Sequence, residues 1–316
     1  MTTLQGLLTV ALFGACLGSF FNVVVWRVPR GMSVAHPPSH CPHCGTRIPF
    51  WRNVPILTWT LQRGRAACCG VRISARYVVL EAFATLLSLG WALAANAGLW
   101  HGDAQAALTW YVFAMLSIPV ALIDWEFFII PDGLNLTGFV LGTALSTFLA
   151  PDPVQGALDA VRGAMVCAGG LYLFAWLFRY LMARWGSMSR RVVEHSWVRK
   201  GFGWMGPRAY RDALRSFLRW GTFNDDTEVL GLGDVNLMIA AGALRGPKAV
   251  LAGIPVAAGL GLLGYLVRAF LPGSVDTARA AGVDDRAVPF GPFLCVGFLI
   301  AQPLLVPYIS AFLLEH

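Results

Sequence analysis

Long apolar blocks, separated by shorter polar stretches, run along this chain from end to end. About 20 apolar residues are enough for a helix to cross a bilayer. We predict eight membrane spans, roughly at 4–26, 77–99, 105–123, 134–150, 160–182, 233–245, 249–270 and 290–313. The pattern therefore predicts an all-α, polytopic membrane protein whose sixth span is short. The first span lacks a basic start and a small-residue cleavage site, so we interpret it as a retained helix rather than a signal peptide.

Composition and charge agree with this fold class and add an orientation. The chain has 316 residues, of which 57% are hydrophobic and 13% charged, and this excludes an ordinary soluble domain. Arginine is concentrated in two polar stretches, 27–76 and 179–219, which lie on the same side if the eight spans alternate. The positive-inside rule makes that side cytoplasmic and places both termini outside. We attribute the net charge of +7 to membrane topology and predict no nucleic-acid partner.

Two carboxylates stand at the ends of different apolar runs. Asp234 follows Gly231-Leu232-Gly233 at the head of one run, and Asp124 ends another. An ionisable group at membrane depth is costly, so each is a functional candidate. Glycine carries no Cβ and lets another backbone approach closely. If the two helix ends meet, the acids form a pair of the kind that aspartic proteases use.

Other acids nearby have simpler explanations. Pro131 stops the third span, and Asp132 directly after it can cap the amino end of the fourth, where its charge also suits the helix dipole. Glu126 fits an interfacial position. Asp124 has no such structural explanation, which strengthens the functional one.

The polar stretch after the first span carries clustered cysteines. Cys41-Pro42-His43-Cys44 is followed some 20 residues later by Cys68-Cys69. A cytosolic face argues against a disulfide, and tetrahedral zinc takes four sulfur or nitrogen ligands. Ala66 occupies the position where a regular second Cys-x-x-Cys would place its first cysteine, so Cys68 or His43 has to replace that ligand. The alternative is a metal-free loop. We take the zinc ligands to be Cys41, Cys44, Cys69 and Cys68.

The first two spans carry small and polar residues at membrane depth. Gly14 and Gly18 lie one helical turn apart and suit close helix packing. Asn22 needs a hydrogen-bond partner there, and an interhelical bond is the simplest one. Glu81 near the start of the second span either extends to the interface or lines a polar cavity.

The second basic stretch is a polar insert at 183–227. Tyr210, Leu214, Phe217 and Leu218 recur at helical spacing among arginines. This predicts an amphipathic segment lying on anionic lipid, with a docking site for an acidic partner as the alternative.

Short motifs distributed over nearly the full length of the chain form one ordered set. They are Gly18-Ser19-Phe20-Phe21-Asn22, Arg27-Val28-Pro29-Arg30, Cys41-Pro42-His43-Cys44, Asn53-Val54-Pro55, Arg63-Gly64-Arg65, Cys69-Gly70, Arg76-Tyr77 with Glu81, Ile123-Asp124, Pro131-Asp132, Glu228 with Gly231-Leu232-Gly233-Asp234, and Pro289-Phe290-Gly291-Pro292. In this order and on these spans the chain resembles the type IV prepilin leader peptidases, the bifunctional prepilin peptidase/N-methyltransferases of the bacterial inner membrane.

The resemblance implies a membrane aspartic peptidase whose catalytic residues are Asp124 and Asp234. The residues that it implies around them are Gly231, Gly233, Asp132 and Glu228. The implied substrates are type IV prepilins or type II secretion pseudopilins, cut at the cytoplasmic face after the glycine that ends their basic leader. The family then methylates the new amino terminus, commonly phenylalanine, with S-adenosylmethionine, and its first loop commonly binds zinc through four cysteines. Gly18, Asn22 and Glu81 are the neighbourhood that we assign to methylation.

Three features of the chain depart from the family pattern. Ala66 replaces the usual third cysteine, and this departure affects both the predicted zinc site and the predicted methyltransferase activity. Asn236 stands where the family most often has lysine, and the insert at 183–227 is longer than expected.

These departures leave alternatives open. One is a peptidase that lacks methyltransferase activity, and a remote one is a small-solute or ion transporter with both aspartates in its path. An archaeal preflagellin peptidase fits less well, because the cysteine loop and the first-span motif point to the bacterial type. We expect residues 1–103 to form an amino-terminal helix pair and 104–316 a six-helix peptidase domain.

Overall fold

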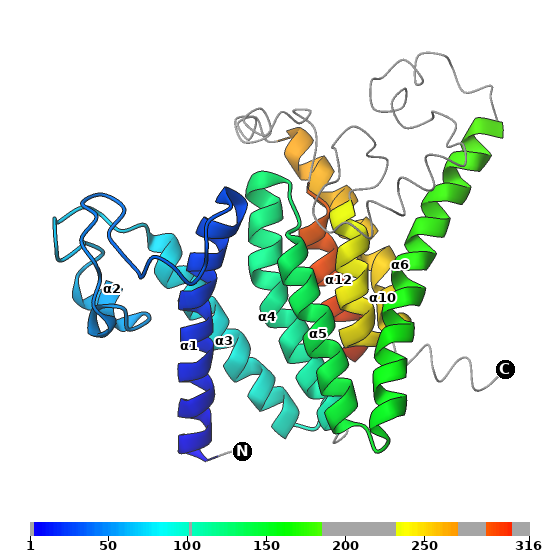
Figure 1. Cartoon of the computed structure of the whole chain (residues 1–316), viewed down its shortest axis with the longest axis horizontal. Coiled ribbons are helices and arrows are strands. Elements are labelled where there is room, and N and C mark those ends of the chain that lie inside the picture. Colours follow the sequence, from blue (N-terminus) through cyan, green and yellow to red (C-terminus); the bar gives the residue numbers. More distant parts are fainter. Residues whose placement is uncertain (1–2, 101–102, 185–231, 271–288, 305–316) are drawn as a thin grey trace.

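The computed structural model describes residues 3–100, 103–184, 232–270 and 289–304. Within these ranges the chain forms helices joined by turns and short loops, and it has no β-strand apart from isolated bridges. Two groups of helices lie side by side, one formed by α1 and α3 and the other by α4, α5, α6, α10 and α12 (Figure 1). The predicted all-α class is confirmed for the described residues.

The amino-terminal group is built on two long helices, α1 (Leu4–Arg27) and α3 (Ala75–Asn96). They approach closely where α1 carries glycine. A Cβ built on Gly18 would lie 2.7 Å from Cα of Glu81, and one built on Gly14 would meet Ser88. The predicted packing through Gly14 and Gly18 is therefore confirmed. The connection between the two helices contains only short elements, η1 (Val28–Arg30), η2 (Phe50–Arg52) and α2 (Leu57–Leu61).

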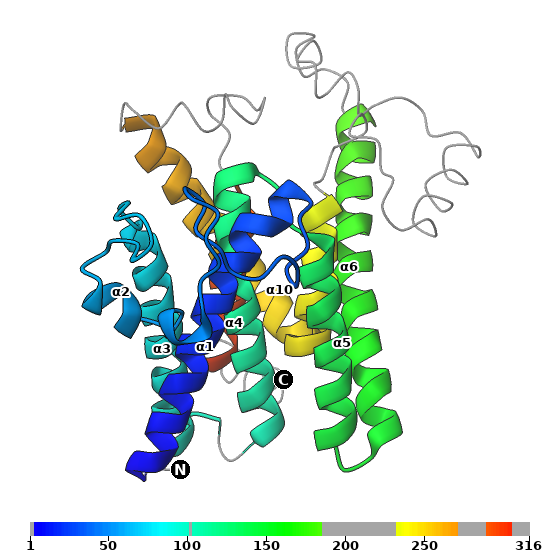
Figure 2. The ribbon, with the colours of Figure 1, turned by 60° about the vertical axis from the view of Figure 1, so that its left-hand side comes forward.

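The second group contains α4 (Ala104–Phe127), α5 (Asp132–Leu149), α6 (Pro153–Arg184), α10 (Leu232–Phe270) and α12 (Gly291–Leu304). Its apolar core joins α4, α10 and α12 through buried side chains that include Phe113, Leu237, Met238, Leu294 and Phe298. In both ribbon views α6 lies on the side of α10 away from α1 and α3 (Figure 2), and α5 packs against both α6 and α10.

One kink divides α10 into two parts. Gly246 has a φ of 73° and a ψ of 164°, which are not helical values, and Pro247 follows it. Proline removes a backbone donor, and glycine adopts positive φ without strain. The parts before and after Gly246 correspond to the predicted sixth and seventh spans.

The described part of each predicted span lies largely in a helix or in one part of the kinked helix, and the end of the last predicted span, 305–313, lies outside the described residues. By length and composition, four described helical segments suffice to cross a membrane, namely Leu4–Arg30, Ala75–Asn96, Ala104–Phe127 and Gly233–Gly264. Large apolar side chains such as Leu8, Leu12 and Phe83 are exposed on α1 and α3, as a lipid-facing surface requires. The number of eight membrane spans stays a prediction.

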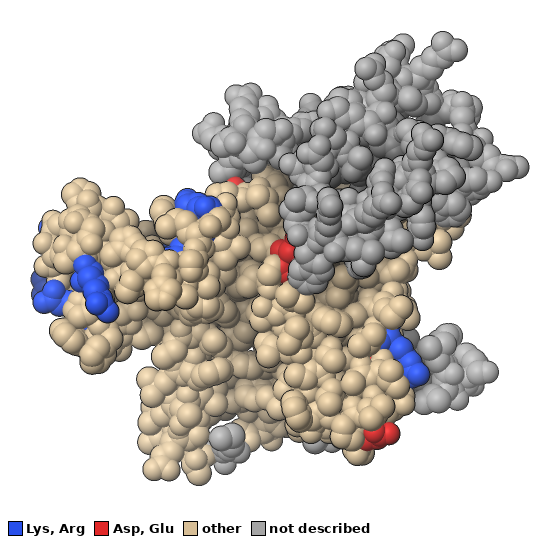
Figure 3. Space-filling view, in the orientation of Figure 1, with Lys and Arg blue, Asp and Glu red and all other residues tan. Residues whose placement is uncertain are grey.

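Charge is distributed unevenly over the described surface. Basic side chains gather on the lobe formed by the connection between α1 and α3 (Figure 3). The exposed arginines of this connection include Arg47, Arg52, Arg63, Arg65 and Arg72. The insert at 183–227 lies outside the described residues except for its first two positions.

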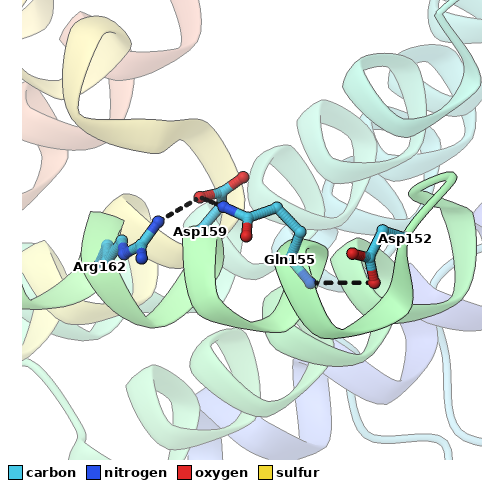
Figure 4. A network of polar contacts seen from close by, with 4 residues as sticks. All are labelled: Asp152, Gln155, Asp159 and Arg162. Carbon is cyan, nitrogen blue, oxygen red and sulfur yellow. Dashed lines mark hydrogen bonds and ion pairs between the residues drawn. The ribbon is translucent and has the colours of Figure 1, made fainter.

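The start of α6 is fixed by local polar contacts. Asp152 caps it by accepting the backbone N–H of Val154 at 2.9 Å. Two turns further on, Asp159 accepts hydrogen bonds from Gln155 and Arg162, so that four polar residues line one side of the helix (Figure 4). These exposed contacts define the start of α6 and add little to stability.

Candidate active site

Asp124 lies in the last turn of α4 and is almost fully buried, with 5% of its surface exposed. Its Oδ2 accepts the backbone N–H of Gly291 at 2.9 Å. Gly291 is the first residue of α12, so the carboxylate lies at the amino-terminal end of that helix, where the dipole favours negative charge. A Cβ on Gly291 would lie 2.7 Å from Oδ2 of Asp124, and therefore only glycine leaves room for this contact.

Asp234 lies in the first turn of α10 and is half-buried. The preceding glycine makes a close contact, because a Cβ on Gly233 would lie 2.7 Å from Cβ of Ile130. The same isoleucine lies 3.0 Å from the Cβ position of Gly291. Ile130 is therefore wedged between the residue that precedes Asp234 and the residue that binds Asp124.

Cys295 gives a second link between the two acids. It lies on α12 one turn after Gly291, is 2% exposed, and is within electrostatic reach of both Asp124 and Asp234. The ends of α4, α10 and α12 thus bring both predicted acids into one neighbourhood. A carboxylate pair requires as its first condition that the two acids lie in one neighbourhood.

Asp132 has a different role from the predicted one. The N-cap of α5 is Pro131, and no side chain caps that helix end, so the prediction that Asp132 caps it is wrong. Asp132 is the first residue of the helix, and its Oδ1 accepts a hydrogen bond of 2.7 Å from Nδ2 of Asn236 on α10. This contact joins the amino ends of α5 and α10 beside the acids. Asn236 contributes a neutral donor at the position where the resemblance led us to expect lysine.

Ionic contacts tie the amino-terminal helices to the same end of α4. Arg76, near the start of α3, forms an ion pair with Glu126, two residues after Asp124. Glu126 thus has an ion-pair partner, and its interfacial position stays a prediction. The guanidinium of Arg30 lies 3.7 Å from the ring centroid of Trp26 and 5.5 Å from that of Phe127.

Two predicted site residues, Gly231 and Glu228, lie outside the described residues. The structure in turn adds residues that we had not assigned to the site. Gly291 and Ile130 pack around the acids, and Cys295 lies within electrostatic reach of both acids. The sequence signal for Gly291 was the motif Pro289-Phe290-Gly291-Pro292, which we had counted among the motifs of the resemblance without giving Gly291 a place in the site.

The structure brings together the three residues that we assigned to methylation. Nδ2 of Asn22 donates to the backbone carbonyl of Tyr77 at 3.2 Å, which confirms the predicted interhelical bond. Glu81 is 8% exposed and accepts the backbone N–H of Ile56 at 2.7 Å. Its burial excludes the interpretation that Glu81 extends to the interface.

The four cysteines of the loop form one cluster. The sulfurs of Cys41, Cys44, Cys68 and Cys69 all lie within 4.8 Å of one another. Individual separations are 3.4 Å between Cys44 and Cys68 and 3.8 Å for Cys41–Cys69 and Cys68–Cys69. Tetrahedral zinc with Zn–S bonds of about 2.3 Å separates its sulfurs by about 3.8 Å. The donor set and its dimensions therefore fit zinc.

The loop contains two turns of the same backbone form. In the first, Cys41 N–H bonds to the carbonyl of Thr46, and in the second, Ala66 N–H bonds to the carbonyl of Val71. Each turn ends in a glycine of positive φ, 71° at Gly45 and 72° at Gly70. Ala66 is thus the counterpart of Cys41, and the second turn keeps its shape without that thiol.

Hydrogen bonds in the cluster lower the pKa of two of its thiols, Cys41 and Cys44. Hydrogen bonds with Thr46 lower the pKa of Cys44 to about 6, whereas the hydrogen bond with Cys44 raises the pKa of Cys68 to about 12. A thiolate is the form that binds a metal. Cys44 is therefore the thiol in this cluster that is most ready to ligate.

Comparisons with known proteins agree with this geometry. Residues 12–95 match the bacterial peptidase A24 N-terminal domain, and residues 111–267 match the type IV leader peptidase family. A prepilin leader peptidase/N-methyltransferase of Myxococcus xanthus is 36% identical over 48% of this chain, and one of Dichelobacter nodosus is 32% identical over 59%. The match spans 43% of the first relative and 71% of the second.

A third relative extends the match along the chain. The enzyme of the same name from Aeromonas hydrophila is 29% identical over 92% of this chain and 88% of its own length. No solved structure matches the chain significantly.

Proposed function

The chain belongs to the type IV leader peptidase family, and from this premise we propose that it cleaves the leader from type IV prepilins or type II secretion pseudopilins and then methylates the new amino terminus. The observation that carries the peptidase half is the convergence of Asp124 and Asp234 around Ile130, Gly291 and Cys295. Two carboxylates at the ends of membrane helices are the parts that a membrane aspartic peptidase needs.

In the proposed reaction the two acids share one proton, because like charges close together do not both ionise cheaply. The pair titrates as a unit. The ionised carboxylate takes a proton from water as that water attacks the scissile carbonyl. The protonated carboxyl group donates a hydrogen bond to the carbonyl oxygen and stabilises the negative charge that develops there.

The chain's own packing supports the orientation of these groups. Gly291 N–H fixes one oxygen of Asp124, and the bond between Asp132 and Asn236 holds the starts of α5 and α10 together. A misplacement of about 1 Å can cost about 100-fold in rate, so such anchors matter for catalysis. Gly231, Gly233 and Glu228 complete the proposed surroundings of the pair.

For the methyltransferase half we propose the region of Gly18, Asn22 and Glu81. S-adenosylmethionine supplies the methyl group when it is bound. The negatively charged Glu81 fits a reaction whose reactants carry positive charge. Because Ala66 departs from the family pattern, a peptidase without methyltransferase activity is the second candidate.

The four clustered cysteines are the proposed zinc site. Cys41, Cys44, Cys68 and Cys69 would hold the ion, which would stabilise the loop as a structural metal does. The matches at 12–95 and 111–267 support our proposed division into 1–103 and 104–316. We place the enzyme in the bacterial inner membrane, with the basic lobe and both aspartates at the cytoplasmic face.

The peptidase assignment is tested by replacing each acid separately. Asp124→Asn and Asp234→Asn should each reduce cleavage of a synthetic prepilin to background, while membrane insertion and zinc content stay unchanged. Asp159→Asn, which alters an exposed carboxylate on α6, is the matched control and should cleave normally. Normal processing by either active-site variant would rule out the carboxylate pair. Mass spectrometry of the product shows at the same time whether a methyl group has been added.

A further inference from the structure

Glu81 is a buried carboxylate whose hydrogen bonds, within the described residues, come from neutral groups. It is 8% exposed on α3, accepts the backbone N–H of Ile56 at 2.7 Å, and is hydrogen-bonded to Ser19 of α1. Within the described part of the chain, the ion pairs are Arg76–Glu126 and Arg162–Asp159, so no described cation pairs with Glu81. A buried carboxylate is normally matched by a positive charge, and this one has only neutral donors.

The backbone that faces Glu81 adopts a rare conformation. Ile56 has a φ of 63° and a ψ of −53°, and Leu57 N–H bonds to the carbonyl of Pro55 at 2.6 Å. This is a γ-turn of the strained kind, with positive φ at a β-branched residue. Strained backbone of this sort persists where the surrounding structure holds it, often at ligand-binding positions. Here the turn directs the N–H of Ile56 at the carboxylate.

Glu81 lies at the same end of the helices as the candidate peptidase site. Arg76 precedes it by five residues on α3, a rise of about 7.5 Å, and pairs with Glu126. Asp124 precedes Glu126 by two residues on α4, a rise of about 3 Å. Each carboxylate therefore lies within about two helical turns of this ion pair along its own helix.

We propose that Glu81 binds the positively charged amino terminus that cleavage creates and presents it for methylation. This inference rests on the proposed function, because cleavage must first expose that amine. An ammonium carries three N–H donors and pairs with a carboxylate through charge-assisted hydrogen bonds. S-adenosylmethionine carries an ammonium group of its own beside its sulfonium, so the experiment below measures its affinity as well as that of the peptide amine.

The same contact gives Glu81 a second task. An ammonium nitrogen has no free electron pair and must lose a proton before it can accept a methyl group. One carboxylate oxygen of Glu81 receives that proton. The hydrogen bond from Ile56 N–H holds the carboxylate in position during this transfer. Glu81 thus acts as the base for its bound amine.

The test compares two peptides and two carboxyl variants in detergent. The peptides begin with phenylalanine, one with a free amine and the other N-acetylated, and each carries a fluorophore at its carboxy end. Wild-type protein should bind the free amine about tenfold more tightly, the usual effect of one charge-assisted hydrogen bond. Glu81→Gln keeps an acceptor for Ile56 N–H but loses the charge, so its preference should vanish. Asp159→Asn should keep the preference.

Activity separates this inference from the proposed function. Glu81→Gln should cleave a synthetic prepilin at the wild-type rate, bind S-adenosylmethionine normally and leave the product unmethylated. Methylation by this variant, or a loss of S-adenosylmethionine affinity with the amine preference intact, would overturn the role of Glu81. If the wild-type protein cleaved but never methylated, the methyltransferase half of the proposed function would fall instead.

A measurement on the wild-type protein guards against misfolding of the variant. A carbodiimide joins a carboxylate to an amine that lies in contact with it, with loss of one water. Treatment of the wild-type complex should couple the free-amine peptide to Glu81, as located by mass spectrometry of protein fragments. The acetylated peptide should not couple. Coupling of the free amine elsewhere, with Glu81 unmodified, would contradict the proposal.

Discussion

Cys68 is the ligand of the proposed zinc site that replaces the missing cysteine at position 66. The second turn of the loop keeps the backbone of the first but has Ala66 where the first has Cys41. Cys68 compensates, because its sulfur lies 3.4 Å from that of Cys44 and 3.8 Å from that of Cys69. These separations match the edges of a zinc–sulfur tetrahedron of about 3.8 Å. Replacing Cys68 should therefore leave three ligands.

We expect Cys68→Ser to weaken zinc binding by at least about 100-fold. Loss of a partner that only orients a ligand already costs about 10–100-fold in metal affinity, and loss of a ligand itself should cost no less. The assay is competition with a chromophoric chelator, followed by zinc content after dialysis. Cys16→Ser is the matched control, since Cys16 lies on α1 away from the cluster.

Restoring the regular spacing gives the decisive variant. In Ala66→Cys/Cys68→Ser the second turn regains a cysteine at the counterpart of Cys41, so zinc affinity should return to within about tenfold of wild type. An undiminished zinc affinity in Cys68→Ser would refute the inference that Cys68 replaces the ligand missing at Ala66. So would a double variant as weak as the single one, because the equivalence of the two turns would then be wrong.

Two further predictions concern the peptidase site and its link to the amino-terminal helices. Gly291→Ala should lower the cleavage rate by about 100-fold with little change in substrate affinity, because its Cβ would lie 2.7 Å from Oδ2 of Asp124 and displace the carboxylate. Steady-state kinetics measures both the rate and the affinity. An unchanged turnover rate would contradict the role of Gly291. A double-mutant cycle with Arg76→Ala and Glu126→Ala should give a coupling energy of at most about 1 kcal/mol in thermal unfolding, because both side chains are about one-third exposed. A coupling energy of several kcal/mol would contradict the view that this ion pair is weakened by solvent.

The sequence predicted the helices well because their signal is local. Each apolar run satisfies its own backbone hydrogen bonds within one segment, so its length and hydrophobicity suffice to locate it. The packing of Gly14 and Gly18 against α3 was also predictable, since small residues one turn apart mark a close helix contact. The kink at Gly246 follows from the adjacent proline, and it separates two spans that the apolar pattern had already distinguished.

Contacts between distant segments were not predictable in the same way. Asp132 was expected to cap its own helix, but the amide of Asn236, on another helix, forms the bond instead. Neither residue carries a local signal for the other. The wedge of Ile130 between Gly233 and Gly291 likewise depends on how three helix ends meet. The sequence predicted both acids, and the structure adds the packing that holds their surroundings together.

The contact between Gly291 and Asp124 also links stability to the candidate chemistry. The first N–H groups of a helix have no partner within it, and an unpaired N–H at membrane depth is costly. At the start of α12 this need is met by the same carboxylate that we assign to catalysis. A substitution that removes every acceptor, such as Asp124→Ala, therefore leaves a buried donor unsatisfied at a cost of about 1–3 kcal/mol. Asparagine keeps a carbonyl oxygen for that N–H while it removes the acid. For this reason the asparagine variant isolates the catalytic role of Asp124 from its structural one.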